Sequence, residues 1–177
     1  MVKKVRIISG KYRGKKLQGF DIDGTRPTMD RVKESLFAMI QTELEDSKCL
    51  DLFAGSGALG LEALSMGAKS CDFIDHNQIA IKTIKKNTEN IDENFKIINL
   101  DYKKYLKETR EKYDVIFLDP PYKNNLLNKA LKYIEEYELL NGGGIVVCEY
   151  EYEDPITNLK LKKERNYGSK KIKIFEK

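Results

Sequence analysis

One short segment of the chain combines residue types that could hold and orient an amino group: Asp119, Pro120, Pro121 and Tyr122 in direct succession. The two prolines lack backbone N–H donors, so the segment presents carbonyl oxygens beside a carboxylate and ends in an aromatic ring. A planar base could stack on this ring while the carboxylate and the first proline carbonyl accept hydrogen bonds from its exocyclic NH₂ group. Although a plain turn also uses prolines, this combination predicts a catalytic site formed by these four residues.

A glycine-rich segment at residues 51–60 could turn the backbone closely around a ligand. Gly55, Gly57 and Gly60 have the G-x-G-x-x-G spacing of a dinucleotide-binding turn. In such a turn the glycines allow the chain to bend tightly below a helix N-terminus. By itself this match is a weak signal, and a plain strand-to-helix turn is the alternative.

Two further carboxylates stand where apolar stretches end. Asp75 follows the glycine segment by about twenty residues, where a nucleoside-binding α/β fold needs an acid to accept ribose hydroxyls. Asp101 ends the next apolar stretch and could accept a hydrogen bond from the amine of an adenine. Each could instead cap the helix that follows it. Together with the glycine segment, they outline an adenosine pocket at the carboxyl edge of a sheet.

The elements that must position these residues follow from the apolar pattern. Short apolar stretches of strand length alternate with amphipathic stretches of helical length, which predicts βαβ units and a mostly parallel sheet with both faces covered. The predicted strands are 48–53, 70–75, 96–100, 114–118 and 145–149, and the predicted helices are 58–65, 78–90, 102–107 and 126–137. Residues 159–164 and 171–175 predict a terminal antiparallel hairpin.

A different pattern precedes the first of these strands. Residues 5–8 and 15–17 alternate between apolar and basic side chains and flank glycines, which predicts a β-hairpin. Thr28 is a candidate N-cap for a helix whose apolar residues, from Val32 to Leu44, recur at helical spacing. We therefore divide the chain into a hairpin extension at 1–27 and a main domain at 28–177.

The charge of the chain is unevenly distributed. The 32 basic and 28 acidic side chains give a net charge of +4, but residues 1–33 hold ten basic and only three acidic ones. Lys and Arg clustered on one surface would attract the phosphates of a nucleic acid, whereas a solvated hairpin without a partner is the alternative. The candidate phosphate contacts, which the family resemblance below implies to be RNA contacts, are Lys11, Arg13, Lys15, Lys16, Arg26 and Arg31.

Several protein classes are excluded by composition. No apolar run approaches the roughly 18 residues that a membrane-spanning helix requires. The only histidine is His76, and the three cysteines are far apart without a CxxC pair, so we expect no metal site and buried reduced thiols. The N-terminus has no apolar region of the kind found in signal peptides, which favours a cytoplasmic location.

The two motifs together resemble the class I S-adenosylmethionine-dependent methyltransferases that modify amino nitrogens. The segments RIISG (6–10), RGKKL (13–17), RPTMDRVKESLF (26–37) and LDLFAGSGALGLEA (50–63) narrow the resemblance to the bacterial RsmD family. Members of this family methylate N2 of one guanine in 16S ribosomal RNA. The resemblance implies a Rossmann-like, mostly parallel sheet with an antiparallel C-terminal hairpin and a small N-terminal hairpin-plus-helix extension.

The family pattern also implies roles for individual residues. It places the methionine part of S-adenosylmethionine at 53–57, the ribose at Asp75, adenine near Asp101, and the target guanine at 119–122. His76 and Asp101 stand at positions where family members vary. The resemblance further implies a monomer whose partner is 16S rRNA, within the small subunit or an assembly intermediate. The complete set of expected cofactor-binding residues is Asp51, Phe53, Ala54, Gly55, Ser56, Gly57, Asp75, His76 and Asp101.

Three other functions remain open at this point. A DNA adenine-N6 methyltransferase would use the same Asp-Pro-Pro-Tyr segment, because this segment reads an NH₂ group and not a whole base. An NAD-dependent oxidoreductase would use the glycine segment and Asp75 but would leave residues 119–122 without a role. A non-catalytic RNA-binding factor of ribosome assembly would explain the basic N-terminal segment but not the predicted pocket.

Overall fold

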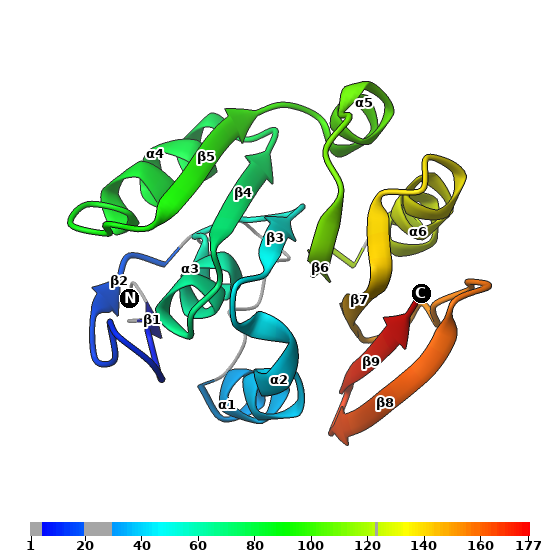
Figure 1. The fold of residues 1–177 in the computed structure, drawn as a ribbon, viewed down its shortest axis with the longest axis horizontal. Helices are drawn as coiled ribbons and strands as arrows, with labels where there is room; N and C mark the ends of the chain where they lie inside the picture. The colour runs from blue at the N-terminus through cyan, green and yellow to red at the C-terminus, as the bar shows by residue number, and fades with distance from the viewer. Residues whose placement is uncertain (1–4, 20–29, 123) are drawn as a thin grey trace.

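A mixed sheet forms the centre of the structure, a computed structural model that describes residues 5–19, 30–122 and 124–177. Within these residues the strand order is β5-β4-β3-β6-β7-β9-β8 (Figure 1). Neighbouring strands from β5 to β7 are parallel, and β9 pairs antiparallel with β7 and β8. The predicted fold class is confirmed. The strands are β3 (Lys48–Asp51), β4 (Ser70–Asp75), β5 (Asn94–Asn99), β6 (Tyr113–Leu118), β7 (Leu140–Tyr150), β8 (Lys160–Tyr167) and β9 (Lys170–Glu176).

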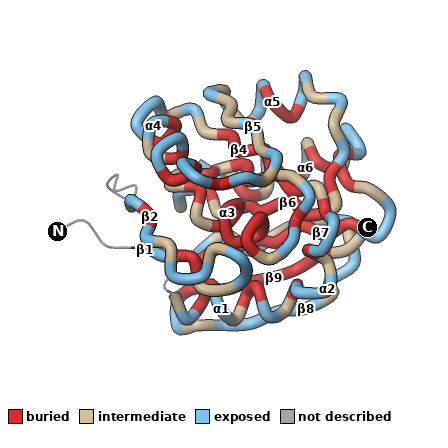
Figure 2. The backbone as a smooth tube through the Cα atoms, turned by 60° about the vertical axis from the view of Figure 1, so that its left-hand side comes forward, coloured by how far each residue is buried: buried red, intermediate tan, exposed pale blue. Residues whose placement is uncertain are grey.

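Helices cover both faces of this sheet because its central strands are buried and apolar on both sides. Leu36, Leu61 and Ile84 belong to the core on one face, and Leu106 and Leu131 to the core on the other. Figure 2 shows buried stretches in α3, β6 and β9. Within the described residues, no helix is long and apolar enough to cross a membrane. The first face carries α1 (Asp30–Met39), α2 (Gln41–Leu44), α3 (Ala58–Ser65) and α4 (Gln78–Asn87), and the second carries α5 (Tyr102–Glu108) and α6 (Leu126–Glu136).

The predicted N-terminal hairpin is present but its strands are short. β1 (Val5–Arg6) pairs antiparallel with β2 (Lys16–Leu17). The strands are shorter than predicted because the intervening residues form a turn, in which the Gly14 N–H donates to the Ile7 carbonyl at 2.8 Å. The Ile7 side chain is fully buried and lies in the same apolar core as α1 and α3.

The helix predicted after Thr28 is divided in two. Asp30 begins α1, while Thr28 itself lies outside the described residues. At Ile40 the backbone leaves helical geometry, with φ −114° and ψ 14°, and α2 starts at the next residue. Leu36, Ile40 and Leu44 are all fully buried in one core, so the apolar spacing continues across the break.

A buried ion pair joins the hairpin to the helical layer. Lys33 of α1 and Glu62 of α3 are each about 1% exposed, and Lys33 Nζ lies 3.1 Å from Glu62 Oε2. The Glu62 carboxylate also accepts the backbone N–H groups of Ile8 and Ser9, at 3.0 and 2.7 Å, while Lys33 donates to the Arg6 carbonyl. The chain after β1 is thus held in place by one charge pair in the core.

Candidate active site

The segments that sequence analysis singled out meet at one edge of the sheet. β3 lies between β4 and β6, and β7 lies beside β6 on its other side. These four strands are parallel, so the residues that follow each of them emerge at the same edge. The glycine segment after β3 is therefore a neighbour of Asp75 at the end of β4 and of the proline segment after β6.

The glycine segment turns from β3 into α3 through two left-handed residues. Gly55 has φ 54° and Gly57, the N-cap of α3, has φ 79°. Non-glycine residues rarely adopt this conformation. Gly60 has another function, because a Cβ there would lie 2.3 Å from Phe73 Cε1 and 2.7 Å from Cys71 Sγ. Its small size lets α3 pack directly on β4, and the loop at residues 53–56 opens toward the shared edge.

Asp51 is the last residue of β3 and the first residue of the glycine segment. Its Oδ2 atom accepts the Gly60 N–H at 3.0 Å, and the residue is buried, with 2% exposed. Burial raises the pKa of this carboxyl to about 7, although the hydrogen bond from Gly60 partly opposes the shift. Asp51 therefore anchors the first turn of α3 through Gly60, and its contact with a cofactor stays a prediction.

Replacing Asp51 with Asn is expected to remove a pH dependence of stability. Folded Asp51 keeps its proton up to about pH 7, whereas the unfolded chain loses it near 3.8. The folded state binds the extra proton between these values, so stability from this group is lost as pH rises, by about 1.4 kcal/mol per pH unit. Asn can still accept the Gly60 N–H but cannot ionise. Urea unfolding of both proteins at several pH values checks this, and a pH-independent difference would contradict it.

Asp75 links the glycine segment to the end of β4. Its Oδ2 accepts the Gly55 N–H at 2.9 Å and its Oδ1 accepts the Asn77 N–H at 2.8 Å. Each carboxylate oxygen can accept more than one hydrogen bond, so the group can still receive ribose hydroxyls. His76 is exposed, with its Nδ1 3.7 Å from Asp75 Oδ1.

Asp101 follows β5 and caps α5. Its Oδ1 accepts the N–H groups of Lys103 and Lys104, at 2.9 and 3.2 Å, which is the capping role that the sequence had left open. Beside it, the partly buried Tyr102 ring lies 5.2 Å from the Phe53 ring, between centroids. Sequence analysis had not singled out Tyr102, although an aromatic residue directly after Asp101 could have indicated it.

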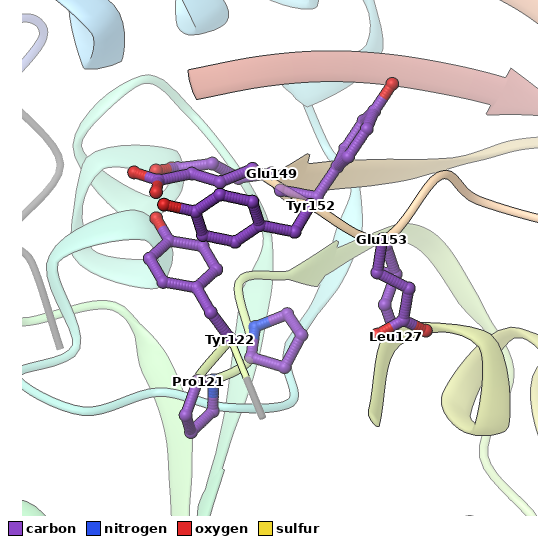
Figure 3. Close-up of a pocket in the computed structure, with 9 residues that line it drawn as sticks. Pro121, Tyr122, Leu127, Glu149, Tyr152 and Glu153 are labelled. Carbon is purple, nitrogen blue, oxygen red and sulfur yellow. The ribbon is translucent and has the colours of Figure 1, made fainter. Parts of the chain in front are cut away.

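The proline segment lines a small cavity that is open to solvent (Figure 3). Pro120 is buried, Pro121 is exposed, and the Tyr122 ring extends from the loop toward Glu149 at the end of β7. Burial, the nearby carboxylates of Asp119, Glu149 and Glu151, and a hydrogen bond to Glu151 raise the pKa of Tyr122 above its usual value. Tyr122 therefore stays a neutral hydrogen-bond donor. The cavity lining is Pro120, Pro121, Tyr122, Leu127, Glu149, Tyr150, Glu151, Tyr152 and Glu153.

The opposite side of this cavity consists of residues that sequence analysis missed. Glu149 directly follows Cys148, the β7 partner of Leu118, so Glu149 stands beside Asp119 across the two strands. Glu149 is 1% exposed and forms an ion pair with the buried Lys170 of β9, whose side chain is 8% exposed. Glutamates occupy every second position from the end of β7 onward, at residues 149, 151 and 153, and this pattern could have indicated the acidic side of the cavity.

The basic residues of the hairpin lie away from this edge. The Tyr12 N–H donates to Ser65 Oγ at the far end of α3, and Lys11 Nζ lies 2.8 Å from Glu93 Oε1 in the connection before β5. Lys15 donates to the Glu89 carbonyl. Figure 1 shows β1 and β2 well separated from β6 and β7. Three further candidate contacts are exposed: Arg13, Lys16 and Arg31. The last candidate, Arg26, lies outside the described residues.

Comparison with known proteins identifies the family. A family model described as conserved hypothetical protein 95 matches residues 5–176. The chain is also 37% identical to ribosomal RNA small subunit methyltransferase D of Haemophilus influenzae, over 97% of this chain and 93% of that protein. The chain belongs to the RsmD family.

Solved structures show which fold this chain shares. The Escherichia coli methyltransferase yhhF is 30% identical, with a TM-score of 0.89 over 99% of this chain and 98% of that one. A more distant fold relative is the Thermus thermophilus 16S rRNA N2 G1207 methyltransferase RsmC, solved with AdoMet and guanosine. It is 19% identical, with a TM-score of 0.67 over 100% of this chain and 50% of that one. The fold of this RsmD family member is thus that of class I methyltransferases.

Proposed function

We propose that this protein transfers a methyl group from S-adenosylmethionine to N2 of a guanine in 16S rRNA of the small ribosomal subunit. The observation that carries the proposal is the meeting of the glycine segment and the proline segment at one sheet edge. The RsmD relative acts on small-subunit rRNA by its name, and the RsmC structure holds AdoMet and guanosine. We further propose that the protein acts as a monomer.

S-adenosylmethionine fits the residues at this edge. Gly55 and Gly57 leave the loop without side chains, in left-handed backbone that a bulkier residue would strain. The Asp75 carboxylate suits a pair of ribose hydroxyls, and the rings of Phe53 and Tyr102 offer an apolar surface to adenine. When bound, this cofactor supplies a methyl group on a positively charged sulfur, which is already a strong electrophile.

The protein therefore needs mainly to align a weak nucleophile. In the proposed complex, the Asp119 carboxylate and the Pro120 carbonyl accept the two hydrogens of the guanine N2 amine, and Tyr122 stacks on the base. This contact turns the nitrogen lone pair toward the methyl group, and such alignment supplies much of the rate enhancement in transfer reactions. As the new N–C bond forms, the methyl–sulfur bond would break and release S-adenosylhomocysteine, while the nitrogen loses a proton that, in this proposal, the Asp119 carboxylate accepts.

The decisive experiment combines transfer and product identification. Small subunits from cells without this activity are incubated with the protein and labelled S-adenosylmethionine, and the rRNA digest is analysed by mass spectrometry. We expect N2-methylguanosine. Formation of N6-methyladenine in a parallel incubation with DNA would favour the DNA methyltransferase alternative. Binding of NADH but not of S-adenosylmethionine, measured by calorimetry, would favour the oxidoreductase. Cofactor binding without any transfer would favour the assembly factor.

We also propose that residues 1–27 extend the 28–177 domain toward rRNA phosphates. Reversing two exposed charges, Arg13→Glu and Lys16→Glu, is expected to weaken RNA binding and to reduce the slope of log affinity against log salt by about 1.5, because each lost phosphate contact removes roughly 0.7–0.9. Filter binding at several salt concentrations measures this. The matched control reverses Lys112 and Lys132, which are exposed on other elements. Equal effects in both variants would leave net charge as the explanation and contradict a hairpin contact.

A further inference from the structure

The proline segment explains how an amine is held but not which base carries it. Guanine N2 and adenine N6 are both exocyclic NH₂ groups, and Asp119 with Pro120 could accept either. The two bases differ at the neighbouring ring atom: guanine N1 carries a hydrogen, whereas adenine N1 is an acceptor. A residue that distinguishes them must stand beside the amine site and present an acceptor to N1.

Two buried glutamates of β7 and its extension stand at this place. Glu149 and Glu151, the acidic wall, are 1% and 7% exposed and line the same cavity as residues 120–122. The wall emerges beside Asp119 because β6 and β7 are paired in parallel up to Leu118 and Cys148. Carboxylates are costly to bury and offer acceptors only, so a cavity lined by them favours a ligand edge rich in donors.

The contacts of the two acids separate their roles. Glu149 forms the buried ion pair with Lys170, which joins β7 to β9. Glu151 instead receives a hydrogen bond from the hydroxyl of Tyr122, the ring that stacks on the base in the proposed complex. Glu151 is therefore held next to the base plane, and a carboxylate that accepts one phenol can accept further hydrogen bonds.

We propose that Glu151 selects guanine by accepting its N1–H while Asp119 and Pro120 hold N2. This inference rests on the proposed function and adds the residue that sets its base preference. Adenine would bring the lone pair of its N1 against the carboxylate, so the acidic wall would reject it. Glu151 is thus a specificity-determining residue, and Glu149 with Lys170 supports the wall on which it lies.

The test compares two RNA substrates that share the N2 amine but differ at N1 and at the neighbouring 6-substituent. In one the target is guanine; in the other it is 2,6-diaminopurine, which keeps the N2 amine but has an acceptor at N1. The wild-type protein is expected to methylate guanine at least about 100-fold faster, because a site built to pair with a donor rejects an analogue that lacks it. In Glu151→Gln the amide can donate to N1, so the preference should narrow by about tenfold or more.

Tyr122→Phe is the matched control for a merely structural role. It removes the phenol that bonds to Glu151 but keeps both the stacking ring and the carboxylate. If Glu151 served only to hold Tyr122, then Glu151→Gln and Tyr122→Phe would shift the base preference equally. We expect both variants to methylate RNA more slowly, but only Glu151→Gln to change the ratio of the methylation rates of the guanine and diaminopurine RNAs.

The outcomes separate this inference from the function on which it rests. Absence of N2 methylation of either RNA by the wild-type protein would overturn the proposed function. An unchanged ratio in Glu151→Gln, with N2 methylation intact in the wild type, would overturn only the role of Glu151. If a variant has no measurable turnover, competition between the two RNAs for binding gives the same ratio, and the same narrowing is required.

Discussion

An Asp119→Ala variant is expected to lose methyl transfer by about 1,000-fold or more while it binds S-adenosylmethionine almost as tightly as the wild type. In the proposed mechanism Asp119 both orients the amine and accepts its proton, and misalignment of reacting groups alone can cost several orders of magnitude. Cofactor binding is spared because the glycine segment, Asp75 and Tyr102 follow other strands, β3, β4 and β5. Single-turnover transfer and calorimetric titration measure the two effects separately.

Asp119→Asn provides the conservative comparison for this prediction. The amide keeps one oxygen that can accept an N–H bond, but it is a far weaker proton acceptor. Its transfer rate should therefore lie between those of the wild type and Asp119→Ala, which separates orientation from proton acceptance. Full turnover by folded Asp119→Ala would show that the amine is held elsewhere.

The positions of the central elements could be predicted because the central strands are parallel and covered on both faces. Strands buried on both sides appear as continuous apolar stretches, and the predicted strand at 70–75 coincides with β4. The predicted ends of strands and helices were less accurate than their positions. β7 starts at Leu140 instead of residue 145, since its first residues include three glycines that carry no apolar signal. α4 ends at Asn87 instead of residue 90, and Asn90 has a positive φ of 62°.

The candidate site was only partly predictable from local sequence. The glycine and proline segments could be found because their backbone requirements are local and depend on glycine and proline themselves. The positions of Glu149 and Glu151 beside Asp119 depend on which strand pairs with β6, and no local pattern specifies that partner. Likewise, Asp51 and Asp75 both ended predicted strands, but only the fold shows that one supports α3 and the other the loop.

Charge along the chain was also an incomplete guide to position. Lys11 and Lys15 belong to the basic N-terminal segment, but in the fold they contact Glu93 and the Glu89 carbonyl near the start of β5. Their location is set by the buried contact of residues 8–9 with Glu62, more than fifty positions away in the sequence. A charge count cannot reveal such a contact, because it does not depend on the basic residues themselves.

Glu62→Gln is expected to lower the free energy of unfolding by about 3–5 kcal/mol. Lys33 and Glu62 are each about 1% exposed, and removal of one partner from a buried pair leaves an ammonium group without its counter-charge in the core. The amide also offers only one acceptor oxygen, where the carboxylate serves Ile8 and Ser9 as well as Lys33. Urea unfolding measures the loss, and hydrogen exchange at the Ile8 and Ser9 amides should become faster.

Glu93→Gln is the matched control, since it makes the same chemical change in an ion pair near the surface. The Lys11 and Glu93 side chains of that pair are 57% and 18% exposed, so water screens the Lys11 charge and the pair contributes little to stability. Glu93→Gln should therefore lower the free energy of unfolding clearly less than Glu62→Gln does. Similar losses in both would mean that water reaches Lys33 after the substitution, and that the hairpin docks through its apolar side chains, Val5, Ile7 and Leu17, instead of through the buried charge.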